Sequence, residues 1–199
     1  MAYFSYIIVI LNETIVWGGI MFKISSISVS ASAVMLLIYG LFAKENVIIS
    51  GSITATLLIS VFYFISRKIT IISKNTLSLY VIFILLSVLL GRSLNFYGLV
   101  FGWDKLLHFL SGFVLVKSAD EIYLKLGGKK ENKILYNIFL LCFAASFAAL
   151  WEIWEFSGDK IFKTTAQNNS LADTMLDIIM GTSGGAIMVV LKNTLQRKK

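Results

Sequence analysis

The chain has 199 residues, of which 57% are apolar and only 15% are charged. An ordinary soluble domain carries about 25% charged residues, so this composition excludes a soluble globule, and its hydrophobicity excludes a disordered chain. The single cysteine, Cys142, excludes a disulfide scaffold and a cysteine-based zinc site. A membrane protein with several spanning helices is the class that fits.

Apolar stretches long enough to cross a bilayer follow one another along the chain. A spanning helix needs about 20 mainly apolar residues. We predict seven such helices, with six as the alternative because the fifth has charged flanks. They cover residues 2–22, 24–43, 47–65, 75–91, 103–122, 134–151 and 171–191. The predicted fold is therefore an all-α, polytopic membrane bundle. Glu13, inside the first segment, is expected to have a structural role.

Basic residues fall mainly on one side of the seven predicted spans. One side receives 13 of the 18 lysines and arginines, and the other receives Lys44, Arg92, Lys105, Lys160 and Lys163. This bias is typical of a positive-inside protein, and it predicts an outer amino terminus and a cytoplasmic carboxyl terminus in a cell (inner) membrane. Contact with anionic lipids accounts for the net charge of +7, so we expect no nucleic-acid partner.

The polar chemistry is concentrated in the second half of the chain. We expect one integral membrane domain over residues 1–199, with scaffold helices in residues 1–90 and the motif-bearing helices in residues 91–192. Six acidic residues lie near the predicted outer ends of three helices: Asp104, Glu152, Glu155, Asp159, Asp173 and Asp177. His108 follows Asp104 by one helical turn and shares its face.

These helix ends are predicted to bring distant acids together at one membrane depth. A charge near the centre of a membrane helix costs about 2.5–3.5 kcal/mol on insertion scales, and such residues commonly mark functional sites. Six acids face four outer cations, and one divalent ion would neutralise the remaining two charges. Alternatively, neighbouring carboxylates could share protons. The predicted metal ligands are Asp104, His108, Glu152, Asp173 and Asp177. Oxygen ligands with one imidazole suit Mg²⁺, Mn²⁺ or Ca²⁺, and Zn²⁺ also fits.

Small residues accompany the acidic residues on the same helices. Gly181 and Gly185 continue the stripe of Asp173 and Asp177, and Gly112 follows His108 by four residues. Small side chains let membrane helices approach closely. We therefore expect the last three helices to pack tightly below the acidic cluster.

The motifs around these residues resemble a known family. They are Trp103-Asp104-Lys105-x-x-His108-Phe109, Trp151-Glu152-x-x-Glu155 and Asp173-x-x-x-Asp177-x-x-x-Gly181-x-x-x-Gly185. Over about residues 90–190 the chain resembles the YjdF-type family of bacterial inner-membrane proteins. That family is similar to the VanZ-like superfamily, which shares an Asp-Lys-x-x-His motif and a late Asp-x-x-x-Asn-x-x-x-Gly pattern. Asp177 stands at the usual asparagine position and adds negative charge. The resemblance implies a multi-pass bacterial membrane protein; some VanZ-like members are linked to glycopeptide-antibiotic resistance, and no settled reaction comes with the group.

Two classes of function fit these features. The first is an enzyme that uses a metal ion on a lipid or lipid-linked head group. In it, His108 and Glu155 would be catalytic, and Arg92 and Lys105 would hold phosphate. The second is a non-enzymatic transporter, or a lipid-binding or envelope-stress membrane protein. Transporter sites favour the bilayer midplane between repeats. This cluster lies near one interface and we find no repeat, so we favour the enzyme.

Simpler roles stay open for the same residues. Asp173 could cap the last helix, where a negative charge favours the helix dipole. Glu152 and Glu155 could form a solvated helix end, and His108 could be a hydrogen-bonded packing residue. Arg92 could be an interfacial anchor rather than a phosphate ligand.

Overall fold

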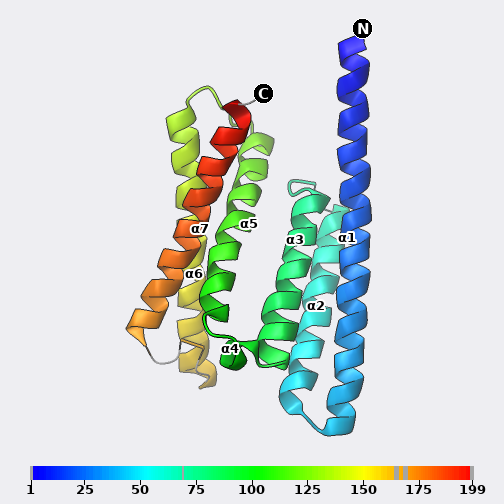
Figure 1. Cartoon of the computed structure of the whole chain (residues 1–199), viewed down its shortest axis with the longest axis vertical. Coiled ribbons are helices and arrows are strands. Elements are labelled where there is room, and N and C mark those ends of the chain that lie inside the picture. Colours follow the sequence, from blue (N-terminus) through cyan, green and yellow to red (C-terminus); the bar gives the residue numbers. More distant parts are fainter. Residues whose placement is uncertain (1, 69, 164–165, 168–169, 198–199) are drawn as a thin grey trace. The chain divides into compact units, whose positions relative to one another are not determined.

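The computed structural model describes the backbone except at residues 1, 69, 164–165, 168–169 and 198–199, and the side chains within residues 18–194 outside those gaps. Every regular element in this described part is helical (Figure 1). The elements are α1 (Ala2–Ala43), α2 (Asn46–Lys68), α3 (Lys74–Ile84), the π-helix η1 (Leu85–Ser93), α4 (Phe96–Leu99), α5 (Trp103–Lys125), α6 (Lys133–Phe162) and α7 (Leu171–Arg197). The predicted all-helical class is confirmed.

Five helical segments of 20 to 30 residues are long and apolar enough to cross a membrane. They are Gly18–Ala43, Asn46–Lys68, Lys74–Ser93, Lys133–Phe162 and Leu171–Thr194. These segments support a helical membrane bundle. The exact number of spans and the side of each loop stay predictions.

Helix α1 corrects one predicted boundary. The apolar pattern predicts one span that ends at residue 22 and another that begins at residue 24, with a turn at Lys23. In the structure the helix continues through Lys23, and Gly18–Ala43 is a single candidate span. A lone lysine breaks no backbone hydrogen bond, and the chain has no proline to interrupt the helix. The turn at Lys23 is therefore wrong, and the outer amino terminus that depended on it loses its basis. The Glu13 side chain lies outside the described residues.

Helix α5 is long enough to span but too charged to be among those five segments. Its 23 residues extend about 35 Å at 1.5 Å per residue. The charges lie toward its two ends, and several are paired with neighbouring helices: Lys105 with Asp173, and Asp120 with Lys192. Charges paired in this way need not face lipid. A crossing by α5 stays a prediction.

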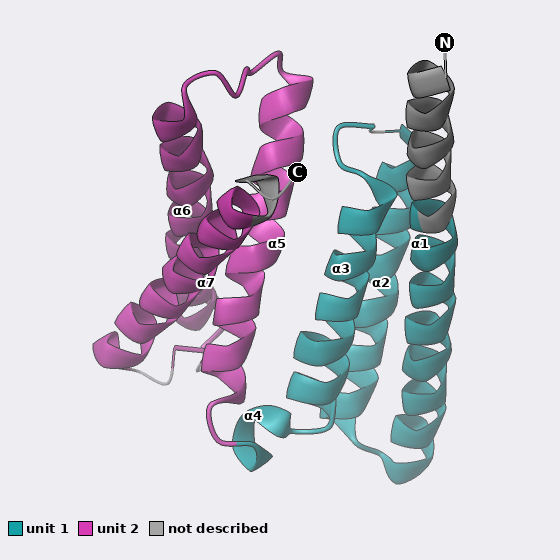
Figure 2. Cartoon of the chain, turned by 45° about the horizontal axis from the view of Figure 1, so that its top comes forward, with its two compact units in different colours: residues 1–100 teal, residues 101–199 magenta. Residues whose placement is uncertain are grey.

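The chain divides into two compact units, residues 1–100 and residues 101–199 (Figure 2). The sequence predicts a change from scaffold to motif-bearing helices near residue 90, within one domain. That single domain stays a prediction. Each unit has a core of its own.

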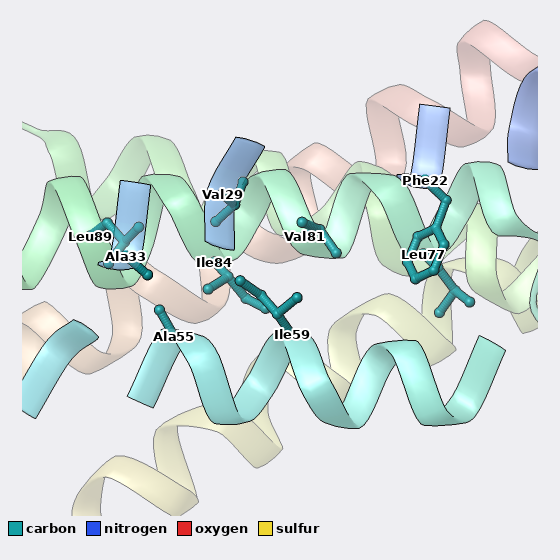
Figure 3. Packing of buried hydrophobic residues seen from close by; sticks show 9 residues of the cluster. All are labelled: Phe22, Val29, Ala33, Ala55, Ile59, Leu77, Val81, Ile84 and Leu89. Atoms are coloured by element: carbon teal, nitrogen blue, oxygen red, sulfur yellow. The ribbon is translucent and has the colours of Figure 1, made fainter. Parts of the chain in front are cut away.

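The core of unit 1 is apolar. Side chains from α1, α2, α3 and η1 point toward one another there (Figure 3). They are Phe22, Val29, Ala33, Ala55, Ile59, Leu77, Val81, Ile84 and Leu89. The π-helix η1 approaches α2 closely because Gly51 faces Ser93, and a side chain at Gly51 would overlap the Ser93 hydroxyl.

Unit 2 is built on close contact between α5 and α7. A Cβ atom at Gly112 would overlap the Gly181 carbonyl, and one at Gly184 would overlap the Phe109 carbonyl. Helix α6 completes the contact with alanines, since a Cβ at Gly181 would lie 2.9 Å from Ala148 Cβ. The close packing predicted from Gly112, Gly181 and Gly185 is confirmed. Gly184 is an additional contact that the sequence analysis did not single out.

Candidate metal centre

Three helices of unit 2 bring the five predicted ligands together. Asp104 and His108 lie in the first two turns of α5, and Asp173 and Asp177 lie in the first two turns of α7. Glu152 is a buried residue of α6. The glycine contacts between α5 and α7 begin one turn further along each helix, so they hold the two acidic ends side by side.

His108 lies at the centre of the cluster. Its Nε2 atom is 3.7 Å from Asp104 Oδ1 and 3.7 Å from Asp177 Oδ1. The same atom is 3.8 Å from Glu152 Oε1. These separations are longer than hydrogen bonds, which are about 2.7–3.2 Å. The ligand atoms of Asp104, His108 and Asp177 all lie within 4.8 Å of one another.

Two of the carboxylate oxygens are buried and accept no hydrogen bond from the described residues. They are Glu152 Oε1 and Asp177 Oδ1, in side chains whose residues are each 2% exposed. Asp177 Oδ1 lies 2.7 Å from Lys105 Nζ, but the ammonium donates its hydrogen bond to Oδ2 at 2.8 Å. A buried polar atom without a partner costs about 1–3 kcal/mol, and more if it is charged. Glu152 Oε1 therefore favours a cation or a proton beside it, whereas Asp177 Oδ1 already has the Lys105 ammonium close by.

Lys105 supplies one cation to the cluster. Its ammonium donates to Asp104 at 3.2 Å, to Asp173 at 2.5 Å and to Asp177 at 2.8 Å. Three aspartates contact this ammonium and Glu152 faces His108, so the cluster holds four carboxylates and one ammonium, which leaves three negative charges uncompensated when all four are ionised. Like charges this close repel one another strongly in a medium of low dielectric constant. A second cation would therefore reduce the net negative charge of the cluster.

Gln167, in the connection between α6 and α7, orients Glu152. Its side-chain amide donates to the Glu152 carbonyl oxygen at 3.0 Å and to Glu152 Oε2 at 3.3 Å. Asp159 fixes this connection by accepting the backbone N–H groups of Ala166 and Gln167 at 2.8 and 3.0 Å. Oε2 is thereby occupied, while Oε1 is the oxygen that faces His108. No sequence signal marks Gln167, because its role depends on how the connection folds back.

Glu155 on α6 and Arg92 on η1 are the remaining predicted site residues. Glu155 is half-buried and accepts the indole N–H of Trp151 at 2.9 Å, so its described hydrogen bond is on its own helix. Arg92 is exposed in the last turn of η1, in unit 1. The catalytic role of Glu155 and the phosphate-binding role of Arg92 stay predictions.

The start of α7 bears on the simpler explanation for Asp173. The Ser170 hydroxyl accepts the backbone N–H of Asp173 at 3.3 Å, so a serine provides the side-chain cap. The Asp173 carboxylate instead accepts from Lys105. Asp173 therefore belongs to the ionic cluster as well as to the first turn of the helix.

The family whose model matches the chain is described as one of membrane proteins, in agreement with the helical architecture. The model of the family described as "Predicted membrane protein (DUF2238)" matches residues 24–198, which include the whole cluster. The chain belongs to this family. Five candidate spans and the family together support a multi-pass membrane location.

A relative in Thermotoga maritima has a similar sequence over part of its length. This protein, named "Uncharacterized protein", is 36% identical to the chain over 104 residues. The match covers 51% of this chain and 53% of the relative, so the chain spans about half the length of that relative. No solved structure matches the chain.

Proposed function

We propose that this membrane protein binds one divalent cation between α5, α6 and α7 and uses it to act on the head group of a membrane lipid or lipid-linked molecule. One observation carries the proposal: His108 Nε2 is surrounded at 3.7–3.8 Å by three carboxylate oxygens, two of them buried without a hydrogen bond. The proposed ligands are Asp104, His108, Glu152 and Asp177, with Asp173 supporting them through Lys105.

The spacing of these atoms is close to that of a coordination shell. Atoms bonded to one ion at about 2.1 Å lie about 3.0 Å apart in an octahedral shell and about 3.4 Å apart in a tetrahedral one. The observed separations of 3.7–3.8 Å between His108 Nε2 and the three oxygens exceed these values by about 0.3–0.8 Å, and the ligand atoms of Asp104, His108 and Asp177 lie within 4.8 Å of one another, so the side chains would move inward to bind an ion. Three oxygens and one imidazole nitrogen suit Mg²⁺, Mn²⁺, Ca²⁺ or Zn²⁺.

A cation in this position supports phosphoryl or acyl chemistry. It would polarise an oxygen of the head group or activate a water molecule. If His108 is a ligand, Glu155, three residues from Glu152 on α6, is the predicted carboxylate left to act as a general base. Lys105 would offset part of the negative charge of Asp173 and Asp177.

We also propose a YjdF-type, VanZ-like family assignment and a location in the inner membrane. The Asp104-Lys105-x-x-His108 sequence motif is what supports a YjdF-type, VanZ-like assignment. Lys23 lies within α1, and the other 17 lysines and arginines divide 12 to 5 between the two predicted sides, which supports an outer-facing centre in an inner membrane.

A specific observation favours a second candidate, a non-enzymatic transporter or lipid-binding protein. Lys105 already brings a positive charge to three aspartates. Protons on the remaining buried carboxylates could then complete the cluster without a metal ion. In that case the cluster would carry or exchange protons.

Thermal unfolding of the purified protein in detergent distinguishes the two candidates. Added Mn²⁺ should stabilise the wild type by mass action and so raise its melting temperature. At a Mn²⁺ concentration 100 times the dissociation constant, the free energy of unfolding should rise by about 2.7 kcal/mol. Asp177→Ala should lose this response. Glu131→Ala, which removes an acid whose side chain is 83% exposed, should retain it.

A second variant covers the case in which Asp177→Ala fails to fold. His108→Gln keeps a polar side chain of similar length and should also lose most of the Mn²⁺ response. A wild-type protein whose stability is unchanged by Mg²⁺, Mn²⁺, Ca²⁺ and Zn²⁺ would contradict the metal centre and favour the proton-based alternative.

A further inference from the structure

We infer that the cluster around His108 selects a small transition-metal ion such as Mn²⁺ over Ca²⁺, and that Gln167 sets this selectivity by holding one oxygen of Glu152. This inference rests on the proposed function, because it identifies the class of ion that the candidate metal centre would take. Gln167 acts through Glu152 and is therefore a positioning residue rather than a ligand.

Divalent ions differ in how they use a carboxylate. Ca²⁺ takes about six to eight oxygen ligands at about 2.3–2.6 Å and commonly binds both oxygens of one carboxylate. Smaller transition-metal ions take fewer ligands at shorter distances and accept single carboxylate oxygens together with an imidazole nitrogen. A site whose carboxylates each offer one oxygen therefore favours the smaller ion.

The two aspartates beside His108 each have one oxygen held by Lys105. The ammonium donates to Asp104 Oδ2 at 3.2 Å and to Asp177 Oδ2 at 2.8 Å. The Oδ1 atoms of these two aspartates are the ones that lie 3.7 Å from His108 Nε2. The ammonium is also 2.7 Å from Asp177 Oδ1, so an ion would compete with it there. Neither aspartate can turn both oxygens to one ion while Lys105 stays in place.

Glu152 is divided in the same way, by a different donor. The Gln167 amide donates to Glu152 Oε2 at 3.3 Å and to the Glu152 carbonyl oxygen at 3.0 Å, so it ties the side chain to its own backbone. Oε1 is buried, accepts no hydrogen bond from the described residues and lies 3.8 Å from His108 Nε2. Glu152 thus presents one oxygen to the cluster.

Asp159 holds Gln167 in this position. Its two oxygens accept the backbone N–H groups of Ala166 and Gln167 at 2.8 and 3.0 Å. Asp159 lies in the last two turns of α6, the helix that also carries Glu152. The connection is therefore tied to α6 itself, and the Gln167 amide stays beside Glu152 Oε2.

The helices that carry the ligands also resist expansion of the cluster. The backbones of α5 and α7 are in contact just beyond the acidic ends, where Gly112 faces the Gly181 carbonyl and Gly184 faces the Phe109 carbonyl. Cavity size and flexibility, together with ligand number, decide between divalent ions. A cluster anchored on such close backbone contacts favours the smaller ion.

Separate titrations of the full chain in detergent with Mn²⁺ and with Ca²⁺ test the selectivity. The concentration of each ion that gives a fixed rise in melting temperature compares the two affinities by mass action. The wild type should need less Mn²⁺ than Ca²⁺. Gln167→Met removes the amide and frees Glu152 Oε2, and it should narrow the ratio of the two concentrations about tenfold, the lower end of the effect of outer-shell partners. Thr174→Val, at another polar residue lining the cavity between α6 and α7, should leave the ratio unchanged.

A second variant covers the case in which Gln167→Met fails to fold. Asp159→Ala releases the connection that carries Gln167 and should narrow the ratio in the same direction. A variant that merely destabilised the fold would lower the melting temperature without changing the ratio. An unchanged ratio in the folded variants would overturn the role of Gln167.

The wild-type titrations also separate this inference from the proposed function. Equal responses to Mn²⁺ and Ca²⁺, both lost in Asp177→Ala, would overturn the selectivity and leave the metal centre standing. A wild-type protein that responds to neither ion would contradict the metal centre and the selectivity together.

Discussion

The two units hold their helices together by different contacts. In unit 1 the buried contacts between α1, α2, α3 and η1 are mainly apolar, as in the cluster of Val29, Ile59 and Leu89. In unit 2 an apolar cluster is accompanied by glycine contacts and by ionic clusters toward both ends of α5. Unit 1 shows that these helices can pack without buried charge. The charges of unit 2 therefore need a separate explanation.

The two ionic clusters of unit 2 differ in how well they are satisfied. Around Asp120, Oδ1 accepts from the Tyr136 hydroxyl and pairs with Lys130 at 3.0 Å, and Oδ2 pairs with Lys192. Around His108, Asp177 Oδ1 pairs with Lys105 at 2.7 Å, but the buried Glu152 Oε1 accepts no hydrogen bond from the described residues and lies 3.8 Å from His108 Nε2. A fully satisfied polar network stabilises a fold, and a partly satisfied one costs stability. The difference favours a structural role for the Asp120 cluster and supports the proposal that the His108 cluster binds a ligand.

The largest expected effect tests the glycine contacts of unit 2. Gly184→Ala places a methyl group against the Phe109 carbonyl, so α5 and α7 must separate. We expect the free energy of unfolding to fall by about 3 kcal/mol, the upper part of the range for overpacking. Gly19→Ala in unit 1 is the matched control, because its Cβ would meet only the end of Lys74 at 3.9 Å and a helix gains about 0.5–1 kcal/mol from this change. Equal unfolding curves for the two variants in a denaturing detergent would contradict the contrast between the units.

A smaller effect tests the Asp120 cluster as a structural contact. Asp120→Asn leaves Lys192, whose side chain is 14% exposed, without its carboxylate. Because the pair is only partly buried, we expect a loss of about 2 kcal/mol, less than for a fully buried pair. Glu131→Gln breaks an exposed pair with Lys129 and should change stability by less than about 1 kcal/mol. The Mn²⁺ response should persist in Asp120→Asn; its loss would show that the two clusters do not have separate roles.

The smallest expected effect tests whether the Lys105 ammonium competes with the metal ion. Lys105→Met removes a cation from among three aspartates while keeping an unbranched side chain. The affinity for Mn²⁺ should rise by about tenfold, or about 1.4 kcal/mol, because the ammonium no longer competes with the ion. Lys160→Met, at an exposed lysine outside the cluster, should leave the affinity unchanged. A lower affinity in Lys105→Met, measured by calorimetric titration, would mean that Lys105 orients the ligands rather than competing with the ion.

Helix periodicity and membrane depth predicted much of this arrangement. The helical membrane class follows from composition, and the proximity of Asp104, His108 and Asp177 follows from helix ends that share one depth. The stripe of Gly181 and Gly185 indicated the surface along which α7 meets α5, because small residues are the ones that tolerate backbone contact.

Other features depend on three-dimensional detail that periodicity does not contain. Glu152 and Glu155 are three residues apart, which turns their side chains about 60° from each other around α6. That rotation is enough to direct Glu152 to His108 and to leave Glu155 beside Trp151. The contact of Gln167 with Glu152 depends on how the connection between α6 and α7 folds. Helix α1 continues through Lys23 because a single charged residue does not create a turn.

Spin-echo spectroscopy of bound Mn²⁺ tests the central claim most directly, because modulation of the electron spin echo reports a nitrogen atom bonded to the ion. The protein contains a single histidine, so His108 is the only source of an imidazole ligand. We predict one Mn²⁺ per wild-type chain with a directly bonded nitrogen, and loss of the nitrogen signal in His108→Gln. Mn²⁺ bound without nitrogen modulation in the wild type would contradict a metal centre built around His108.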